Sequence, residues 1–227
     1  MGSSGSSARE SRAEVQPARG FPPAEFAARA ARAQASMTDQ GLDVLVLTGP
    51  PNVRYFSGFN TQFWESPTRP WFLVVPRVGE PIAIIPEIGV SGMGATWVCD
   101  IRTWPSPRPA DDGVSLLAAA LAQLPRRYAR VGWELGRESV VRMPLVDFER
   151  VGGKAPGLQF ADGTPIVRKL RAVKSEAEIE KLRYVCGVVS DGFEALASNL
   201  RVGESEREPA ASSGSTCWPV ASMLRPI

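Results

Sequence analysis

The 227-residue sequence contains no histidine. This absence excludes Ser-His-Asp and Cys-His catalysis, histidine-ligated metals and an imidazole acid or base anywhere in the chain. Cysteine is scarce too, because the chain has only three and none of them forms a C-x-x-C pair. Neither a disulfide framework nor a thiolate metal site is indicated, and a reducing, cytoplasmic location is expected.

An excess of one charge and long apolar runs are also missing. The 26 basic and 24 acidic residues leave a formal charge of +2, too close to balance to predict a nucleic acid or an anionic membrane as partner. No apolar run approaches the roughly 18 residues that can span a bilayer. The segment 1–20 is rich in Ser, Gly, Ala and Arg and lacks the apolar core of a signal peptide, so a disordered tail is expected there.

What the sequence does contain is an alternation of helical and strand patterns. Phe26, Ala30, Ala33 and Met37 share one helical face, and Gly41 supplies a left-handed stop. The other predicted elements are a helix capped by Asp111 or Asp112, a helix over 138–151, and strands over 43–48, 71–75, 81–85, 96–104, 129–133 and 157–161. The strand 43–48 is expected to end in a turn at 49–51. This pattern predicts an α/β domain over residues 21–162, with a mixed sheet flanked by helices.

A long helix is predicted to follow this domain. Ser175 to Glu178 forms a capping box, and apolar residues then recur at alternating steps of three and four. We call these residues the seam: Ile179, Leu182, Cys186, Val189, Phe193, Leu196 and Leu200. A helix of about 25 residues is roughly 37 Å long, more than packing on the preceding domain requires. The far half of the seam is therefore expected to be exposed in this chain and to form core in a complete protein.

Three motifs, in order along the chain, carry a resemblance to a known family. Residues 52–59 (NVRYFSGF) resemble the P-N-[IV]-x-Y-x-[ST]-G-[FWY] signature in the amino-terminal domain of creatinase and Xaa-Pro peptidases, the pita-bread metallohydrolases. Residues 170–179 (LRAVKSEAEI) are similar to that family's L-R-x-[IV]-K-S-x-x-E-[IL] linker. Residues 201–206 (RVGESE) resemble its R-x-G-x-[ST]-E. With the α/β pattern between them, the three motifs cover residues 21–206.

The resemblance implies a two-domain enzyme with an amino-terminal α/β domain, a crossing helix and a carboxy-terminal pita-bread domain. In the family, two Asp, one His and two Glu of that second domain hold two divalent metal ions (Mn, Zn or Co), although creatinase needs no metal. On this interpretation residues 163–208 are the linker and first helix of a truncated catalytic domain, and 209–227 are an irregular tail. No position matches a catalytic or metal-binding residue, so this chain is expected to hold no cofactor and to be inactive alone.

The loop Thr61–Pro70 supplies the candidate substrate contacts. Two adjacent large aromatics, Phe63 and Trp64, cannot both face one interior from an extended loop, so at least one is expected to be exposed. In homodimeric members of the family this loop reaches over the partner's active site. By position, the resemblance therefore implies that Phe63 or Trp64, with Arg69, contacts substrate in the partner's site; a loop packed on its own domain is the alternative.

Other polar groups have simpler interpretations. The pair Asp111 and Asp112 is expected to cap a helix rather than to bind a cation. Gly58 is expected to give a turn its backbone freedom, and Arg54 and Tyr55 to be architectural. A basic cluster is expected to be a solvated face that caps strand carbonyls, with phosphate binding as the alternative. The cluster consists of Arg168, Lys169, Arg171 and Lys174.

The leading functional hypothesis is the amino-terminal domain of an Xaa-Pro dipeptidase or aminopeptidase, which contributes to dimerisation and substrate access. The expected partners are a second copy of the chain and a proline-containing peptide, with no nucleic acid and no membrane. One alternative is a non-catalytic protein-interaction module of the pseudo-peptidase kind. Another is a creatinase-like or sulfoniopropionate-lyase-like enzyme on a small cationic substrate, which Trp64 would favour through cation–π attraction.

Overall fold

The computed structural model describes residues 16–66, 69–199, 203 and 205. The chain divides into two compact units, one of which spans Gly20–Lys174 and contains all the strands described below. The other includes the long helix α7 (Glu176–Asn199). Most of the expected tail over 1–20 and the expected tail over 209–227 lie outside the described residues.

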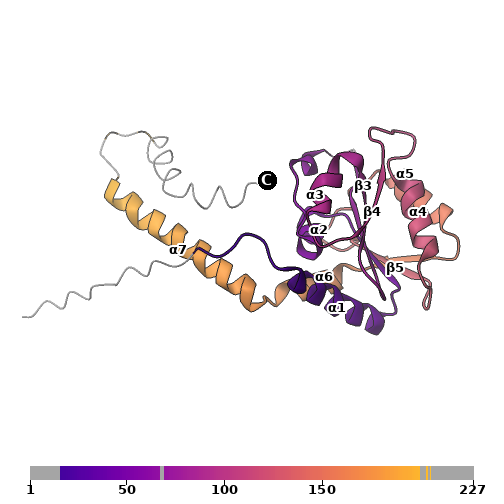
Figure 1. Cartoon of the computed structure of the whole chain (residues 1–227), viewed down its shortest axis with the longest axis horizontal. Coiled ribbons are helices and arrows are strands. Elements are labelled where there is room, and N and C mark those ends of the chain that lie inside the picture. The colour runs from indigo at the N-terminus through magenta and orange to yellow at the C-terminus, as the bar shows by residue number, and fades with distance from the viewer. Residues whose placement is uncertain (1–15, 67–68, 200–202, 204, 206–227) are drawn as a thin grey trace, which may run out of the picture. The chain divides into compact units, whose positions relative to one another are not determined.

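The Gly20–Lys174 unit is an α/β domain, as predicted (Figure 1). Its helices are α1 (Pro23–Gln40), α2 (Pro50–Ser57), α3 (Val90–Gly94), α4 (Val114–Gln123), α5 (Leu145–Lys154) and α6 (Thr164–Ala172), with short 3-10 helices η1 (Gln62–Glu65) and η2 (Glu87–Gly89). Its strands are β1 (Val44–Leu47), β2 (Phe72–Pro76), β3 (Ile82–Pro86), β4 (Asp100–Trp104), β5 (Arg130–Trp133) and β6 (Gln159–Asp162).

The six strands form one mixed sheet in the order β4-β3-β2-β1-β5-β6. β2 runs antiparallel to both of its neighbours, β1 and β3, whereas the β3–β4, β1–β5 and β5–β6 pairs are parallel. The carboxyl ends of β1, β5 and β6 therefore meet at the same edge of the sheet. That edge positions the candidate site.

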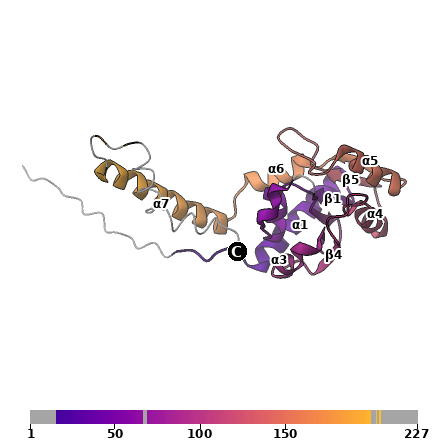
Figure 2. The same cartoon turned by 90° about the horizontal axis from the view of Figure 1, so that it is seen from above.

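Helices cover both faces of the sheet, so the central strands are buried on both sides. In β1, Leu45 and Leu47 pack with α1, α2, α3 and α6, whereas Val44 and Val46 pack with α4 and α5. This alternation is the two-residue side-chain period of a strand. Figure 2 shows the same division from above, with α4 and α5 gathered on one side of β1. All four residues of β1 are buried, which explains the uninterrupted apolar run.

Local signals fix the ends of several elements as predicted. Gly41 ends α1 with φ 66°, a left-handed conformation that favours glycine. At α4 the N-cap residue is Gly113, and the Asp111 carboxylate before it accepts a hydrogen bond from Ser115 N in the first turn at 2.8 Å. At α7, Ser175 N donates to Glu178 Oε2 at 2.8 Å and Glu178 N donates to Ser175 Oγ at 3.3 Å. These reciprocal bonds confirm the capping box.

Three local predictions were wrong. The predicted turn at 49–51 is the start of helix α2, because Pro50 and Pro51 occupy first-turn positions that need no N–H donor. The predicted helix over 138–151 begins only at Leu145, after Glu138 takes a left-handed φ of 63° and Pro144 forms the N-cap. The strand predicted over 96–104 begins at Asp100, since a short turn precedes it.

The compact unit includes α6 and extends to Lys174. Three side chains of α6 are buried in the core beneath α1 and α2, namely Ile166, Val167 and Leu170. Tyr55 in α2 reinforces this packing, because its hydroxyl donates to Leu170 O at 3.3 Å. Gly58 ends α2 with φ 78°, and a Cβ there would lie 2.8 Å from the Phe26 ring. Tyr55 and Gly58 are therefore architectural, as predicted.

Four of the five described seam side chains of α7 are exposed, and the fifth, Ile179, is half-buried. Leu182 is 49%, Val189 38% and Phe193 69% exposed, and Cys186 is exposed as well. The side chains of Leu196 and Leu200 lie outside the described part.

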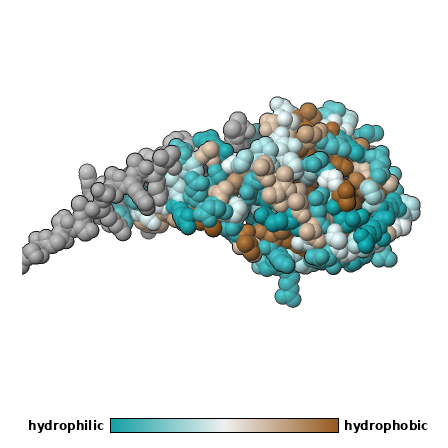
Figure 3. All heavy atoms as spheres, turned by 60° about the horizontal axis from the view of Figure 1, so that its bottom comes forward, coloured by the Kyte–Doolittle hydropathy of each residue, from teal (hydrophilic) through white to brown (hydrophobic). Residues whose placement is uncertain are grey.

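The surface of the Gly20–Lys174 unit mixes hydrophilic and hydrophobic residues on the face drawn in Figure 3. No helix within the described residues combines the length and apolarity that a membrane span requires.

Candidate functional site

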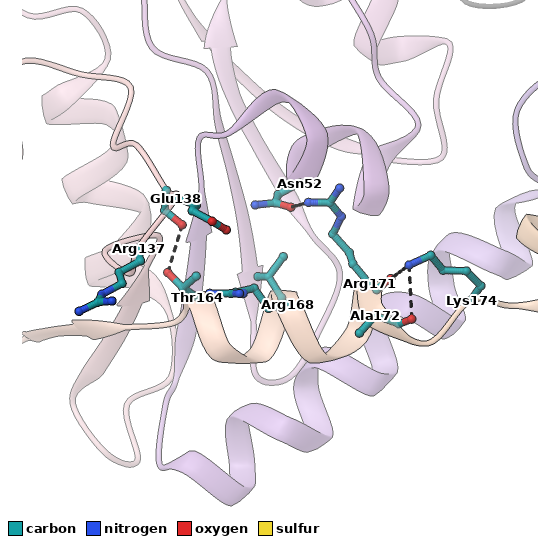
Figure 4. Close-up of a pocket in the computed structure, with 10 residues that line it drawn as sticks. Asn52, Arg137, Glu138, Thr164, Arg168, Arg171, Ala172 and Lys174 are labelled. Carbon is teal, nitrogen blue, oxygen red and sulfur yellow. Dashed lines mark hydrogen bonds between the residues drawn. The ribbon is translucent and has the colours of Figure 1, made fainter.

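A cavity of about 330 Å³ lies in the Gly20–Lys174 unit, beyond the carboxyl ends of β1, β5 and β6 (Figure 4). Three separate segments build it, one after each of these strands. Asn52 follows β1 at the start of α2, residues 137–139 follow β5, and Thr164 to Lys174 follow β6 along α6. Parallel strands bring such segments together at one sheet edge, where α/β proteins bind ligands.

Glu134, the first residue after β5, anchors this edge. Its side chain is only 3% exposed, yet both carboxylate oxygens accept hydrogen bonds. Oε2 accepts hydrogen bonds from Thr48 N at 2.5 Å and Gly49 N at 2.8 Å, and Oε1 accepts one from Asn52 Nδ2. The carboxylate therefore lies at the N-terminus of α2, where backbone donors and the helix dipole stabilise a negative charge.

Asn52 connects this buried carboxylate to α6. Arg171 Nη1 donates to Asn52 Oδ1 at 2.8 Å, so the amide donates on one side and accepts on the other. Asn52 belongs to the first sequence motif and Arg171 to the second. The two motifs, far apart in the sequence, thus meet at one wall of the cavity (Figure 4).

Two more basic residues of the cluster line the cavity, Arg168 on α6 and Lys174 just after it. Lys174 Nζ donates to Arg171 O at 2.6 Å and to Ala172 O at 3.3 Å, so it caps the carboxyl end of α6. The predicted capping of strand carbonyls is therefore wrong for Lys174, because the carbonyls that it binds belong to the end of helix α6. Within the described part of the chain, no hydrogen bond or ion pair engages Arg168, which lines the cavity.

The opposite wall is held by polar contacts around Thr164. Thr164 N donates to Asp162 Oδ1 at 2.9 Å, and Thr164 Oγ1 accepts from Gly136 N at 2.9 Å. Burial raises the pKa of Asp162, but its bonds from Thr164 and from the backbone of Leu135 and Gly136 outweigh this effect, so the pKa lies below its usual value. The segment after β5 is thereby fixed against the start of α6.

The predicted substrate contacts lie elsewhere. Trp64, in η1, is 8% exposed and packs with Phe59 and Trp71, at ring-centroid distances of 5.8 and 5.5 Å. Phe63 is half-buried against the same core, and Arg69 is half-buried. Neither aromatic is fully exposed, contrary to expectation, because the turn of η1 directs both side chains toward their own domain. A role for these residues in a partner's site stays a prediction.

Sequence reasoning missed Glu134 and Glu138. Glu134 carries a detectable signal, because a carboxylate directly after an apolar strand has to find donors in the interior. Glu138, which lines the cavity, carries none, since its left-handed backbone is set by the tertiary structure.

For the two divalent metals that the resemblance implies, the described residues offer no fitting donor set, because none of them form a group of three or more His, Cys, Asp or Glu.

Comparison with known proteins extends these findings. The creatinase/prolidase N-terminal domain family matches residues 29–173. The probable dipeptidase PepE of Mycobacterium tuberculosis is 28% identical over 193 residues, which cover 82% of this chain and 46% of that protein. The agropine synthesis cyclase of Rhizobium rhizogenes is 26% identical over 183 residues, which cover 77% and 43%.

A solved structure agrees with the fold. The dipeptidase PepE of Mycobacterium ulcerans superimposes with a TM-score of 0.69 at 24% identity, covering 88% of this chain and 51% of that one. The chain spans less than half the length of the curated relatives named above. The similarity therefore concerns one half of those proteins.

Proposed function

Because this chain belongs to the creatinase/prolidase N-terminal domain family, we propose that it serves as the amino-terminal domain of an Xaa-Pro dipeptidase or aminopeptidase. In this role it contributes to dimerisation and substrate access, while hydrolysis and the two divalent metals belong to a carboxy-terminal pita-bread domain. The observation that carries the proposal is the family match over 29–173, which falls entirely within the compact Gly20–Lys174 unit.

The two halves of the proposal have different support. The similarity to the probable dipeptidase PepE supports the substrate class, a short peptide. The loop from Thr61 to Pro70 supports substrate access, because it carries Arg69, for which no ion pair is found among the described residues. A guanidinium on such a loop can bind a peptide carboxylate with two parallel hydrogen bonds.

A chimera tests whether this chain can serve as the amino-terminal domain while a separate carboxy-terminal domain carries out hydrolysis. Residues 1–199 of this chain replace the amino-terminal half of the Mycobacterium tuberculosis PepE, and proline release from Leu-Pro and Ala-Pro is measured with Mn²⁺. The chimera is expected to release proline, and the 227-residue chain alone is expected to release none and to bind no Mn²⁺ or Zn²⁺ at micromolar concentrations in calorimetry. Turnover by the chain alone, or a folded, metal-loaded chimera without turnover where PepE is active, would contradict the proposal.

Variants of the chimera test substrate access. Arg69→Ala is expected to lower kcat/KM at least about tenfold, since a charge-assisted bond to a carboxylate contributes about 1.5–3 kcal/mol. Lys154→Ala is the matched control, because Lys154 is an exposed cation on α5, on the opposite face of the sheet. Equal effects of the two substitutions would remove Arg69 from the proposal.

A second candidate is an enzyme that acts on a small non-peptide substrate. The observation that favours it is the similarity to the agropine synthesis cyclase. This relative has an identity comparable to that of PepE, but its name is not that of a peptidase. The two candidate functions are distinguished by offering Leu-Pro, creatine and a sulfonium compound to a protein that carries both this amino-terminal domain and the proposed catalytic domain. Turnover of either compound with none of Leu-Pro would favour the second candidate.

A further inference from the structure

The geometry points to a binding site for a small oxyanion, a phosphate or carboxylate group, in the cavity lined by Asn52, Arg168 and Arg171. This inference concerns the Gly20–Lys174 unit alone and does not depend on the peptidase proposal. Three independent observations lead to it: the place of the cavity in the sheet topology, the charge of its walls, and the occupation of the neighbouring helix terminus by Glu134.

Topology places the cavity beside a switch point. After β1 the chain passes to α2 on one face of the sheet, whereas after β5 it passes to α5 on the other face, and β1 and β5 are adjacent parallel strands. Chain segments that diverge in this way leave a crevice outside the carboxyl ends of the strands. In open α/β sheets this crevice is the usual ligand position.

The walls of the cavity are predominantly cationic. Four of its lining side chains are basic and one, Glu138, is acidic. Arg171 and Lys174 already make the hydrogen bonds described above, whereas the guanidinium groups of Arg137 and Arg168 form no hydrogen bond or ion pair with the described residues. Arg137 lies at the opposite end of the cavity from Lys174 (Figure 4), so Arg168 and Arg171, along one side of α6, are the central cations. Guanidinium groups bind carboxylate and phosphate oxygens in pairs.

The Glu134 carboxylate explains why the ligand would lie against α6. A helix N-terminus after a parallel strand is the common anion position, and at α2 the donors of Thr48 and Gly49 already bind Glu134. A Cβ at Gly49 would lie 2.8 Å from Glu134 Oε1, so the approach there is filled. The remaining place for a bound anion is therefore the adjacent space beside α6.

The size of the cavity limits the class of ligand. About 330 Å³ is near the lower end of the range for small-molecule sites. It accommodates one oxyanion group with a small organic part, but not a dinucleotide. The exposure of Arg168 and Arg171 implies modest, salt-sensitive binding, because solvent screens exposed charges.

Calorimetric or NMR titration of the 227-residue chain tests the site at constant ionic strength, with inorganic phosphate and succinate as the two probes. Saturable binding of at least one probe is expected, and the tighter one identifies the preferred group. Arg168→Gln is expected to weaken that binding at least about fivefold, and Arg168→Lys less than Arg168→Gln, because the charge is kept while the planar fork is lost.

Lys169→Gln is the matched control, since Lys169 is an exposed cation on the same helix and does not line the cavity. It removes the same charge and is expected to change the affinity less than twofold. Unchanged tryptophan fluorescence shows that each variant is folded. Absence of saturation by both probes below about 20 mM would overturn the inference, as would equal weakening by Arg168→Gln and Lys169→Gln, which would indicate diffuse charge only.

Discussion

The substitution Asp43→Asn tests how a buried carboxylate joins β1 to the segment before β5. Asp43 is 2% exposed, and its carboxylate accepts backbone N–H bonds from Arg127 at 3.0 Å, Tyr128 at 2.8 Å and Ala129 at 2.8 Å. Arg77 Nε adds a contact at 3.4 Å. These bonds hold Ala129 at φ 54°, a left-handed conformation that costs a residue with a Cβ roughly 1–2 kcal/mol.

Asparagine at position 43 keeps the shape of the side chain but reverses one end of it. With its oxygen directed at Tyr128 and Ala129, its amide nitrogen faces the donors of Arg127 and Arg77. The substitution removes the negative charge and places the amide NH₂ group, a buried donor, against the N–H donors of Arg127 and Arg77. The free energy of unfolding is therefore expected to fall by about 3 kcal/mol. Urea unfolding at pH 7, followed by tryptophan fluorescence, measures this loss.

The pH dependence supplies an independent readout. Burial raises the pKa of Asp43, but the three backbone bonds and Arg77 outweigh it, so the native pKa lies below the ordinary value of 3.8. The unfolded chain therefore takes up the proton first as the pH falls. The stability that the carboxylate contributes is complete well above pH 3.8 and is lost as the pH falls through the native pKa. The difference in the free energy of unfolding between wild type and Asp43→Asn should therefore narrow as the pH falls below 3.8.

Asp39→Asn is the matched control, because Asp39 is exposed near the end of α1. Its effect is expected to stay within about 0.5 kcal/mol at any pH. The reasoning would be refuted if Asp43→Asn behaved like Asp39→Asn at pH 7. It would also be refuted if the loss for Asp43→Asn were the same at pH 7 and pH 3, because the carboxylate would then contribute nothing through its charge.

Two further substitutions separate the core from the exposed helix. Leu45→Ala, at a fully buried position of β1, is expected to lower the free energy of unfolding by roughly 2–5 kcal/mol in urea titrations, and a loss below about 1 kcal/mol would contradict the two-sided burial of the strand. Phe193→Glu, at a side chain that is 69% exposed, is expected to reduce self-association in sedimentation velocity without changing the unfolding of the Gly20–Lys174 unit; unchanged association would show that the seam is not what drives it.

Local patterns were sufficient for the elements whose signals lie within a few residues. The left-handed Gly41, the apolar run of β1, the hairpin of β2 and β3 and the capping box at Ser175 all agree with the structure. Each depends on backbone conformation or on side-chain period, which neighbouring residues determine. These signals, together with the order of the motifs, were enough to predict the α/β class.

Predictions failed where distant residues decide the conformation. Gly49-Pro50-Pro51 is a typical turn sequence, but the backbone N–H groups of Thr48 and Gly49, directly before α2, donate to Glu134, which is remote in the sequence. The argument from adjacent aromatics assumed an extended loop. In the 3-10 turn of η1, Phe63 and Trp64 instead both pack toward their own domain.

The wall of the cavity explains why the residue types of two distant motifs fit together. Position 52 has to donate to the buried carboxylate of Glu134 and to accept from the guanidinium of Arg171. An asparagine amide does both at once, whereas an aspartate would place a second negative charge against Glu134 and an alanine would leave a buried carboxylate oxygen with one donor fewer. The asparagine of the first motif therefore donates to a buried carboxylate, and the arginine of the second motif donates to that asparagine at the exposed wall of the cavity.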